Sequence, residues 1–252
     1  MLRLLTLALS FLFVQPVFAA IDTDGSNDYI DCGNVLHPSG SGTAFSISAW
    51  INPDVSPGTS SQDAVLGKRS GWGANTDYYS FEFGQWSPND RYMTFDFWGT
   101  GGVGRGSTSN TQLTLNEWAQ VGVTYDGSTV THYLNGSADG TKAISDALNT
   151  GGNSIPFQIG KANSFYFNGT IDEVYIWTNT VINAHQMKIL GKSKVKGIGL
   201  QFSPDAYFYL DDYPDGDGVS GNTFVNLPNR HVCTANGGAS IISVANENLS
   251  YP

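Results

Sequence analysis

The sequence predicts an all-β fold, a sandwich or a barrel, because of its strand periodicity, its turn residues and its composition. Between residues 29 and 177, apolar residues alternate with small or polar ones in short runs. The runs end at pairs such as Asp126-Gly127 and Asn135-Gly136, which tolerate the positive φ angles of hairpin turns. With 30 glycines and only 13% charged residues, the composition fits short strands and argues against disorder or a coiled coil.

The segment 45–51 shows the period of two most clearly, since Phe45, Ile47, Ala49 and Ile51 alternate with small or polar residues. The same alternation recurs in four more segments, 79–83, 92–98, 118–125 and 129–134. Strands at this spacing predict a sandwich or barrel and not βαβ units. A single short helix is predicted after Asn183, which can cap a stripe of apolar residues that ends before Gly191.

The first 19 residues have the features of a signal peptide. Arg3 precedes an apolar run over residues 4–14, and Ala19 offers a small residue for cleavage, with Ala20 as the alternative. An uncleaved anchor is less favoured because the apolar run is short for a membrane span. No second long apolar stretch follows in the sequence. We therefore expect a secreted or cell-surface protein with no membrane span in its mature chain.

Acidic residues outnumber basic ones by 22 to 12, which gives a net charge of −10. Such a chain repels phosphate backbones and anionic membranes, so nucleic acid is not an expected partner, whereas a divalent cation is plausible. Export would permit a disulfide between the two cysteines, Cys32 and Cys233. Spacing alone does not decide between this bond and two buried thiols.

Several segments together resemble the laminin-G-like jelly-roll domains of the concanavalin A-like lectin/glucanase superfamily. Their order and spacing match that family over about residues 22–192, and the matching segments are 24–30, 45–51, 116–121, 125–127, 133–136, 157–160 and 168–177. The resemblance implies two antiparallel sheets in a jelly-roll sandwich with one short helix near the end of the domain. It also gives the expected organisation: a signal peptide at 1–19, a jelly-roll domain at 20–192, and a linker and tail at 193–252.

The tail carries an unusual feature. Residues 206–212, Gly216 and residues 223–225 resemble the motif that usually opens such a domain, yet here they come last. Either the domain is permuted and its own tail completes it, or the tail begins a truncated second copy. A strand without a neighbour leaves an exposed sheet edge. We therefore expect the tail to pair, either with its own domain or with another subunit by self-association.

The resemblance implies a structural calcium ion at the sandwich edge, held by Asp24, the Gly25 carbonyl and Asp172. Calcium needs six to eight oxygen ligands, so further carbonyls and water would complete the shell. The alternative is that Asp24 only forms an Asx turn and Asp172 faces solvent.

Aromatic residues on irregular segments are the candidates for ligand binding, because aromatic faces stack on sugar C–H surfaces and nearby amides or carboxylates bond hydroxyls. Loop aromatics also close the cores of sandwiches, which is the alternative for each of them. The candidate ligand-binding residues are Trp72, Trp86, Trp98, Tyr166, Asp77, Asn89 and Asp90.

Catalysis is not expected. Glycoside hydrolysis needs two carboxylates flanking the scissile bond, but Glu82 and Asp96 lie in separate predicted strands, and Asp172 and Glu173 are adjacent and point to opposite faces. We therefore expect a secreted, non-catalytic binding module for carbohydrate or another extracellular surface ligand. The alternatives are a structural or adhesive protein that assembles through its tail and, less favoured, a glycoside hydrolase.

Overall fold

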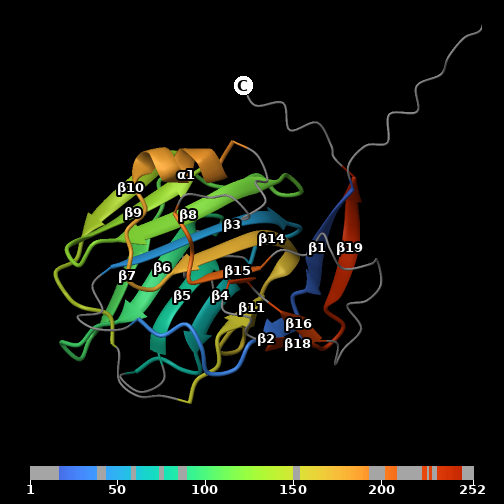
Figure 1. The fold of residues 1–252 in the computed structure, drawn as a ribbon, viewed down its shortest axis with the longest axis horizontal. Coiled ribbons are helices and arrows are strands. Elements are labelled where there is room, and N and C mark those ends of the chain that lie inside the picture. The colour runs from blue at the N-terminus through green and yellow to red at the C-terminus, as the bar shows by residue number, and fades with distance from the viewer. Residues whose placement is uncertain are drawn as a thin grey trace, which may run out of the picture.

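The protein is a sandwich of two antiparallel sheets with one short helix, which confirms the predicted fold class (Figure 1). The computed structural model describes residues 17–38, 44–57, 61–73, 77–84, 90–149, 154–192, 202–208, 223–225, 227–228 and 232–245. In this described part, no helix is long and apolar enough to cross a membrane.

The first sheet has the strand order β10-β9-β8-β3-β14-β1-β19, with β15 beside β14 and β17 beside β15. Its strands are β1 (Val17–Asp24), β3 (Phe45–Pro53), β8 (Ala119–Tyr125), β9 (Thr129–Leu134), β10 (Ser137–Ala143), β14 (Asn168–Trp177), β15 (Ala206–Phe208), β17 (Leu227–Pro228) and β19 (Ser240–Ala245).

The second sheet has the order β16-β18-β2-β11-β4-β5-β6-β7. Its strands are β2 (Tyr29–Asp31), β4 (Asp63–Arg69), β5 (Asp77–Phe83), β6 (Met93–Trp98), β7 (Gly104–Thr108), β11 (Gln158–Ile159), β16 (Thr223–Val225) and β18 (Val232–Asn236). A separate small hairpin joins β12 (Lys161–Ala162) to β13 (Phe165–Tyr166).

The core lies between the two sheets and follows from the alternation in the sequence. In the second sheet, the register aligns a row of inward side chains from five neighbouring strands, Ile30, Ile159, Leu66, Phe81 and Phe95. All five are buried in one apolar cluster with inward residues of the first sheet. Because side chains alternate across a strand, the polar residues between them are placed on the outer face of this sheet.

The predicted helix forms as α1 (Ala184–Leu190), which packs on the outer face of the first sheet. Asn183 caps it, and the Asn183 and Gln186 side chains bond reciprocally to backbone N–H groups. Met187 and Leu190 are buried in a second apolar cluster that includes Trp177. The helix therefore covers one outer face of the sandwich.

The tail completes the same sandwich. Strand β15 pairs with β14, β18 pairs with β2, and β19 pairs with β1, so the tail adds strands to both sheets. Tyr207 of β15 also donates a hydrogen bond (2.9 Å) to the buried carboxylate of Glu173 in β14. Of the two explanations that the sequence left open, the structure has the permuted arrangement.

Strand β1 crosses the predicted cleavage site. Residues 17–19 pair with residues 243–245 of β19, and β1 and β19 lie side by side in Figure 1. Cleavage after Ala19 would leave residues 20–24 to form the strand.

A disulfide joins Cys32, the residue that follows β2, to Cys233 of β18, 201 positions later in the sequence. The two cysteines adjoin Asp31 and Thr234, which are paired in the register of β2 and β18. The bond fixes the tail to the start of the domain. It closes a long loop, which restricts the unfolded chain and thereby stabilises the folded one.

We predict that replacing both cysteines with serine lowers the free energy of unfolding by roughly 2–5 kcal/mol. Urea unfolding of the variant and of the parent protein, followed by circular dichroism, measures the difference. Adding a reductant should destabilise the parent protein only, and equal stability of parent and variant would contradict a structural role for the bond.

A buried histidine makes the stability of the sandwich depend on pH. His132 of β9 lies in the core, and its Nε2 is 2.8 Å from the Ser107 hydroxyl of β7. Burial lowers the pKa of His132 from 6.5 to about 4, and the bond to Ser107 offsets this only in part. Because the unfolded chain binds the proton more readily, the stability that His132 contributes is present above pH 6.5 and is lost as the pH falls toward 4.

We predict that the His132→Leu variant loses less stability than the parent protein between pH 7 and pH 4, by about 3 kcal/mol. The Ser107 hydroxyl also donates to the Phe95 carbonyl (3.3 Å), so the substitution does not leave this hydroxyl without an acceptor. Urea unfolding at several pH values measures this difference. Parallel pH profiles for the two proteins would contradict the contribution of His132.

Candidate functional site

The outer face of the second sheet carries an ordered row of small and polar residues. The register aligns Gln158, Gly67, Ser80, Asp96 and Gly106 across five neighbouring strands. A β-sheet whose inner face is apolar presents its alternate residues outward, so the strand pattern itself produces this polar face.

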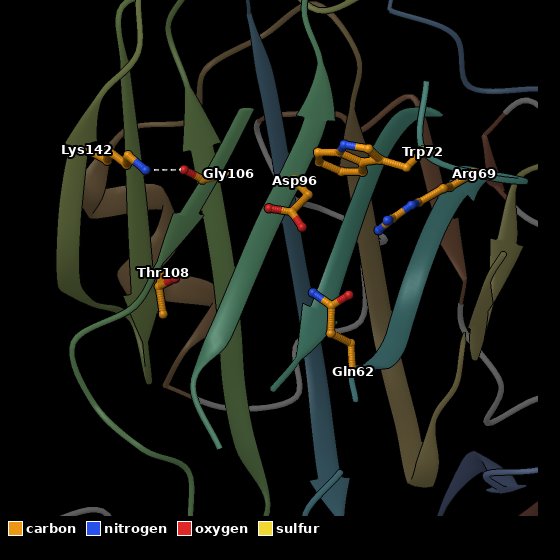
Figure 2. Close-up of a pocket in the computed structure, with 7 residues that line it drawn as sticks. All are labelled: Gln62, Arg69, Trp72, Asp96, Gly106, Thr108 and Lys142. Carbon is orange, nitrogen blue, oxygen red and sulfur yellow. Dashed lines mark hydrogen bonds between the residues drawn. The ribbon is translucent and has the colours of Figure 1, made fainter. Parts of the chain in front are cut away.

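A groove of about 490 Å³ runs over this face, and Figure 2 shows its lining residues. Asp96 lies between Arg69 and Trp72 on one side and Gly106 and Lys142 on the other (Figure 2). The lining is completed by Gln62 and Thr108. The volume lies in the range of small-molecule binding sites.

A buried ion pair anchors one side of the groove. The guanidinium Nη1 of Arg69 is 2.7 Å from Oε1 of Glu82 and also donates to the Ser80 hydroxyl (3.3 Å). The two charged side chains are 7% and 0% exposed, respectively. Burial raises the pKa of Glu82, while the charge of Arg69 and the hydrogen bonds from Ser80 and Arg69 oppose that rise. The pair therefore fixes the direction of the Arg69 side chain in the sheet face.

Arg69 in turn holds an exposed indole. Its guanidinium carbon lies 4.7 Å from the ring centre of Trp72, within the range of a cation–π contact. Trp72 is 51% exposed and meets Trp98 edge-on, with ring centres 5.7 Å apart. Gly104 opposes Trp98 in the next strand, and a Cβ there would overlap the Trp72 indole. A glycine at this position is therefore needed for Trp72 to rest on the sheet.

The hairpin of β12 and β13 packs beside Arg69, next to the groove. It lies on the outer face of β4, since a Cβ on Gly67 would be 3.1 Å from the Ala162 side chain. Phe165 lies toward the groove, 5.8 Å from the Arg69 guanidinium. Its neighbour Tyr166 contacts Tyr29 of β2 instead.

The structure brings two of the seven predicted ligand-binding residues together, Trp72 and Trp98. Tyr166 lies on the far side of the hairpin, where Lys161 is 5.0 Å from its ring centre. Asp90 does not line the groove, and its carboxylate accepts a hydrogen bond from Gln112 (3.0 Å).

The other three predicted ligand-binding residues have no described side chain. Asp77 begins β5 opposite Arg69, but its side chain lies outside the described part. Trp86 and Asn89 also lie outside the described residues.

The residues predicted to bind calcium do not form one site. Asp24 pairs with Asn168 in the register, which places Asp172 four residues further along β14, about 13 Å away at strand spacing. The Asp24 carboxylate accepts the Ser26 N–H (2.8 Å), and the buried Asp172 accepts the Glu173 N–H (2.8 Å). No cluster of three metal-ligating side chains occurs among the described residues. The arrangement does not fit the expected ion, and calcium stays an untested prediction.

The register also brings together two carboxylates that sequence reasoning placed on separate strands. Glu82 and Asp96 lie on adjacent strands, on the same face and diagonal to each other, because Ser80 opposes Asp96 and Glu82 opposes Thr94. Glu82 is completely buried and held by Arg69. A general acid must reach the glycosidic oxygen, and Glu82 in this position does not.

Sequence reasoning missed most of the groove, including Gln62, Arg69 and Lys142. Arg69 and Asp96 lie on strands, whereas the predicted ligand contacts were aromatic residues and their polar neighbours on irregular segments. The period-two pattern of β5 and β6 would have placed Ser80, Glu82 and Asp96 on one face. Lys142 comes from the opposite sheet, so only the closure of the sandwich brings it to the groove.

The fold and the groove define a lectin-like jelly-roll sandwich with a polar, aromatic-flanked cleft on one sheet. A laminin-G family model described as concanavalin A-like lectin/glucanases superfamily matches residues 24–186, well over half of the chain. The chain therefore belongs to the concanavalin A-like lectin/glucanase superfamily, as the sequence resemblance predicted. No curated protein sequence matches it.

Solved structures support the same fold at low sequence identity. A crystal structure described as a candidate carbohydrate-binding protein from Bacteroides ovatus is 20% identical with a TM-score of 0.63. That similarity covers 90% of this chain and 60% of the other, so the present chain spans less than two thirds of its length. A heptameric SAP-like pentraxin from Limulus polyphemus is 11% identical with a TM-score of 0.55, covering 93% and 98% of the two chains.

We predict that Arg69→Met destabilises the protein by about 3–5 kcal/mol, because it leaves the Glu82 carboxylate buried without its counter-charge. The double variant Arg69→Met/Glu82→Leu should regain much of that stability, since neither charge remains. In both variants Trp72 loses its cation–π partner and should become more accessible to acrylamide quenching. Urea unfolding and quenching measure the two effects, and wild-type stability in the single variant would contradict the ion pair.

Proposed function

We propose that the protein is a secreted, non-catalytic carbohydrate-binding module that holds its ligand in the groove on the outer face of the second sheet. The observation that carries this proposal is the exposed Trp72 indole, which Arg69 holds beside a floor of hydrogen-bonding groups. A large aromatic side chain half exposed to water offers a flat apolar surface for the C–H face of a sugar ring.

The remaining lining groups suit the hydroxyls of the same ligand. Asp96 supplies carboxylate oxygens, Gln62 supplies an amide that both donates and accepts, and Thr108 supplies a hydroxyl. An apolar platform next to several hydrogen-bonding groups is the combination that sugar rings require, because a sugar has both C–H faces and polar edges.

Four further observations support this proposal over its alternatives. Glu82, the carboxylate diagonal to Asp96, is buried and ion-paired with Arg69, which argues against hydrolysis. The tail strands pair within the sandwich, so assembly through the tail has no support in the described part. The Cys32–Cys233 bond fits an exported protein, because disulfides persist in oxidising compartments. The Bacteroides ovatus structure, described as a candidate carbohydrate-binding protein, shares the fold.

We predict that Trp72→Ala lowers affinity for a bound polysaccharide about tenfold, since an aromatic platform contributes about 1.4 kcal/mol through stacking and burial. Affinity electrophoresis against a panel of soluble polysaccharides identifies the ligand, and isothermal titration calorimetry of the parent and variant measures the loss. The variant should keep the parent's melting temperature, because Trp72 is half exposed.

Val181→Ala is the matched control, since it removes an exposed apolar side chain between β14 and α1, away from the groove. It should bind like the parent protein. Polysaccharide binding that survives Trp72→Ala would exclude the groove as the site, and release of reducing sugar by the parent protein would overturn the non-catalytic assignment.

A further inference from the structure

A second cavity of about 280 Å³ adjoins the groove at the edge of the second sheet. The two share Gly106 and Lys142, so a ligand in the groove can extend into the second cavity. The cavity is lined by Gly104, Arg105, Gly106, Lys142 and residues 143–145.

The charge of this cavity is opposite to that of the protein as a whole. Among the described residues, its lining holds the cations Arg105 and Lys142 and no carboxylate, although the chain has a net charge of −10. Asp146 pairs with Arg105 through Nε (3.0 Å), but its carboxylate also accepts hydrogen bonds from Gly101 and Thr100 in the neighbouring loop. Within the described part of the chain, Lys142 has no carboxylate within 4.0 Å.

The position of the Lys142 ammonium is fixed by the backbone. Its Nζ donates a 2.6 Å hydrogen bond to the Gly106 carbonyl, drawn as a dashed line in Figure 2. This bond holds the ammonium at the junction of the two cavities. It uses one of three N–H donors, which leaves donors for a ligand.

The edge of β7 (Gly104–Thr108) adds a backbone donor. β7 ends the described order of the second sheet, and the Gly106 carbonyl points off that edge toward Lys142. In an antiparallel strand the N–H and C=O of one residue point the same way, so the Gly106 N–H also points off the edge. Asp96 lies on the other side of Gly106, over the sheet face, since a Cβ on Gly106 would overlap its carboxylate.

We propose that this second cavity is an anion subsite, formed by Lys142, Arg105 and the Gly106 backbone, which takes a carboxylate or sulfate group of an acidic polysaccharide. The inference rests on the proposed function, because the neutral part of the same polysaccharide would lie in the groove against Trp72 and Asp96. Two cations and an edge N–H supply charge-assisted hydrogen bonds for an anionic oxygen, whereas Asp96 disfavours a negative group in the groove itself.

The test compares acidic polysaccharides with their neutral counterparts. Polygalacturonate, alginate and hyaluronan are offered beside their carboxyl-reduced forms, and dextran sulfate beside dextran. We expect at least about tenfold tighter binding of the acidic member of a pair, weakening with added salt. Comparison of the carboxylated polysaccharides with dextran sulfate, each against its neutral counterpart, shows which anion the subsite prefers.

Lys142→Gln should remove about tenfold of the affinity for the acidic member and much less of the affinity for the neutral member, because Lys142 also lines the groove. Lys188→Gln is the matched control, because Lys188 is an exposed lysine on α1, which covers the other sheet. It should bind both members like the parent protein. Both substitutions are at exposed side chains, and melting temperatures confirm that each variant is folded.

The outcomes separate this inference from the proposed function. Equal binding of acidic and neutral members, lost on Trp72→Ala, would overturn the anion subsite and keep the groove. Acidic preference that survives Lys142→Gln would also overturn the subsite. No binding to any polysaccharide, or binding indifferent to Trp72→Ala, would overturn the proposed function and the subsite with it.

Discussion

The ion pair between Arg69 and Glu82 is the constraint on which the candidate site depends. A guanidinium on the face of a sheet would normally extend into water, but here a buried carboxylate holds it flat against β5. Because Arg69 is fixed, Trp72 can lie over it and Phe165 can pack beside it from the hairpin. One buried charge pair thereby positions an exposed aromatic platform in the groove and gives the neighbouring hairpin a packing partner.

The two outer faces of the sandwich differ in the residues that they carry and in how far they are covered. The outer face of the first sheet carries aromatic residues such as Tyr175, Trp177 and Tyr207 of the tail, and α1 packs against this cluster. The outer face of the second sheet carries glycine, serine and carboxylates, which need no apolar cover. That face carries the proposed ligand groove, and the glycines at 104 and 106 leave room for the side chains of Trp72 and Asp96 to lie on it.

The tail shows how a permuted order of strands can still give a complete sandwich. The pairing of β15 with β14 depends on the register between residues 206–208 and 174–176, not on their order in the chain. The disulfide to Cys32 and the Tyr207–Glu173 hydrogen bond attach the tail at both sheets. Joining distant segments costs conformational entropy in folding, which the covalent bond reduces by restricting the unfolded chain.

The sequence by itself determined the fold class, the capped helix after Asn183 and the strands with clear alternation, β3, β5, β6, β8 and β9. These depend on local periodicity and turn chemistry. It also identified Trp72 and Trp98 as aromatic ligand candidates. Only the tertiary structure decided that Cys32 meets Cys233, that Glu82 and Asp96 share a face, and that Asp24 and Asp172 do not meet. Lys142 likewise reaches the groove from the other sheet. The reason is that cross-strand register and sheet closure are set by contacts between residues far apart in the chain, which alternation within one strand does not specify.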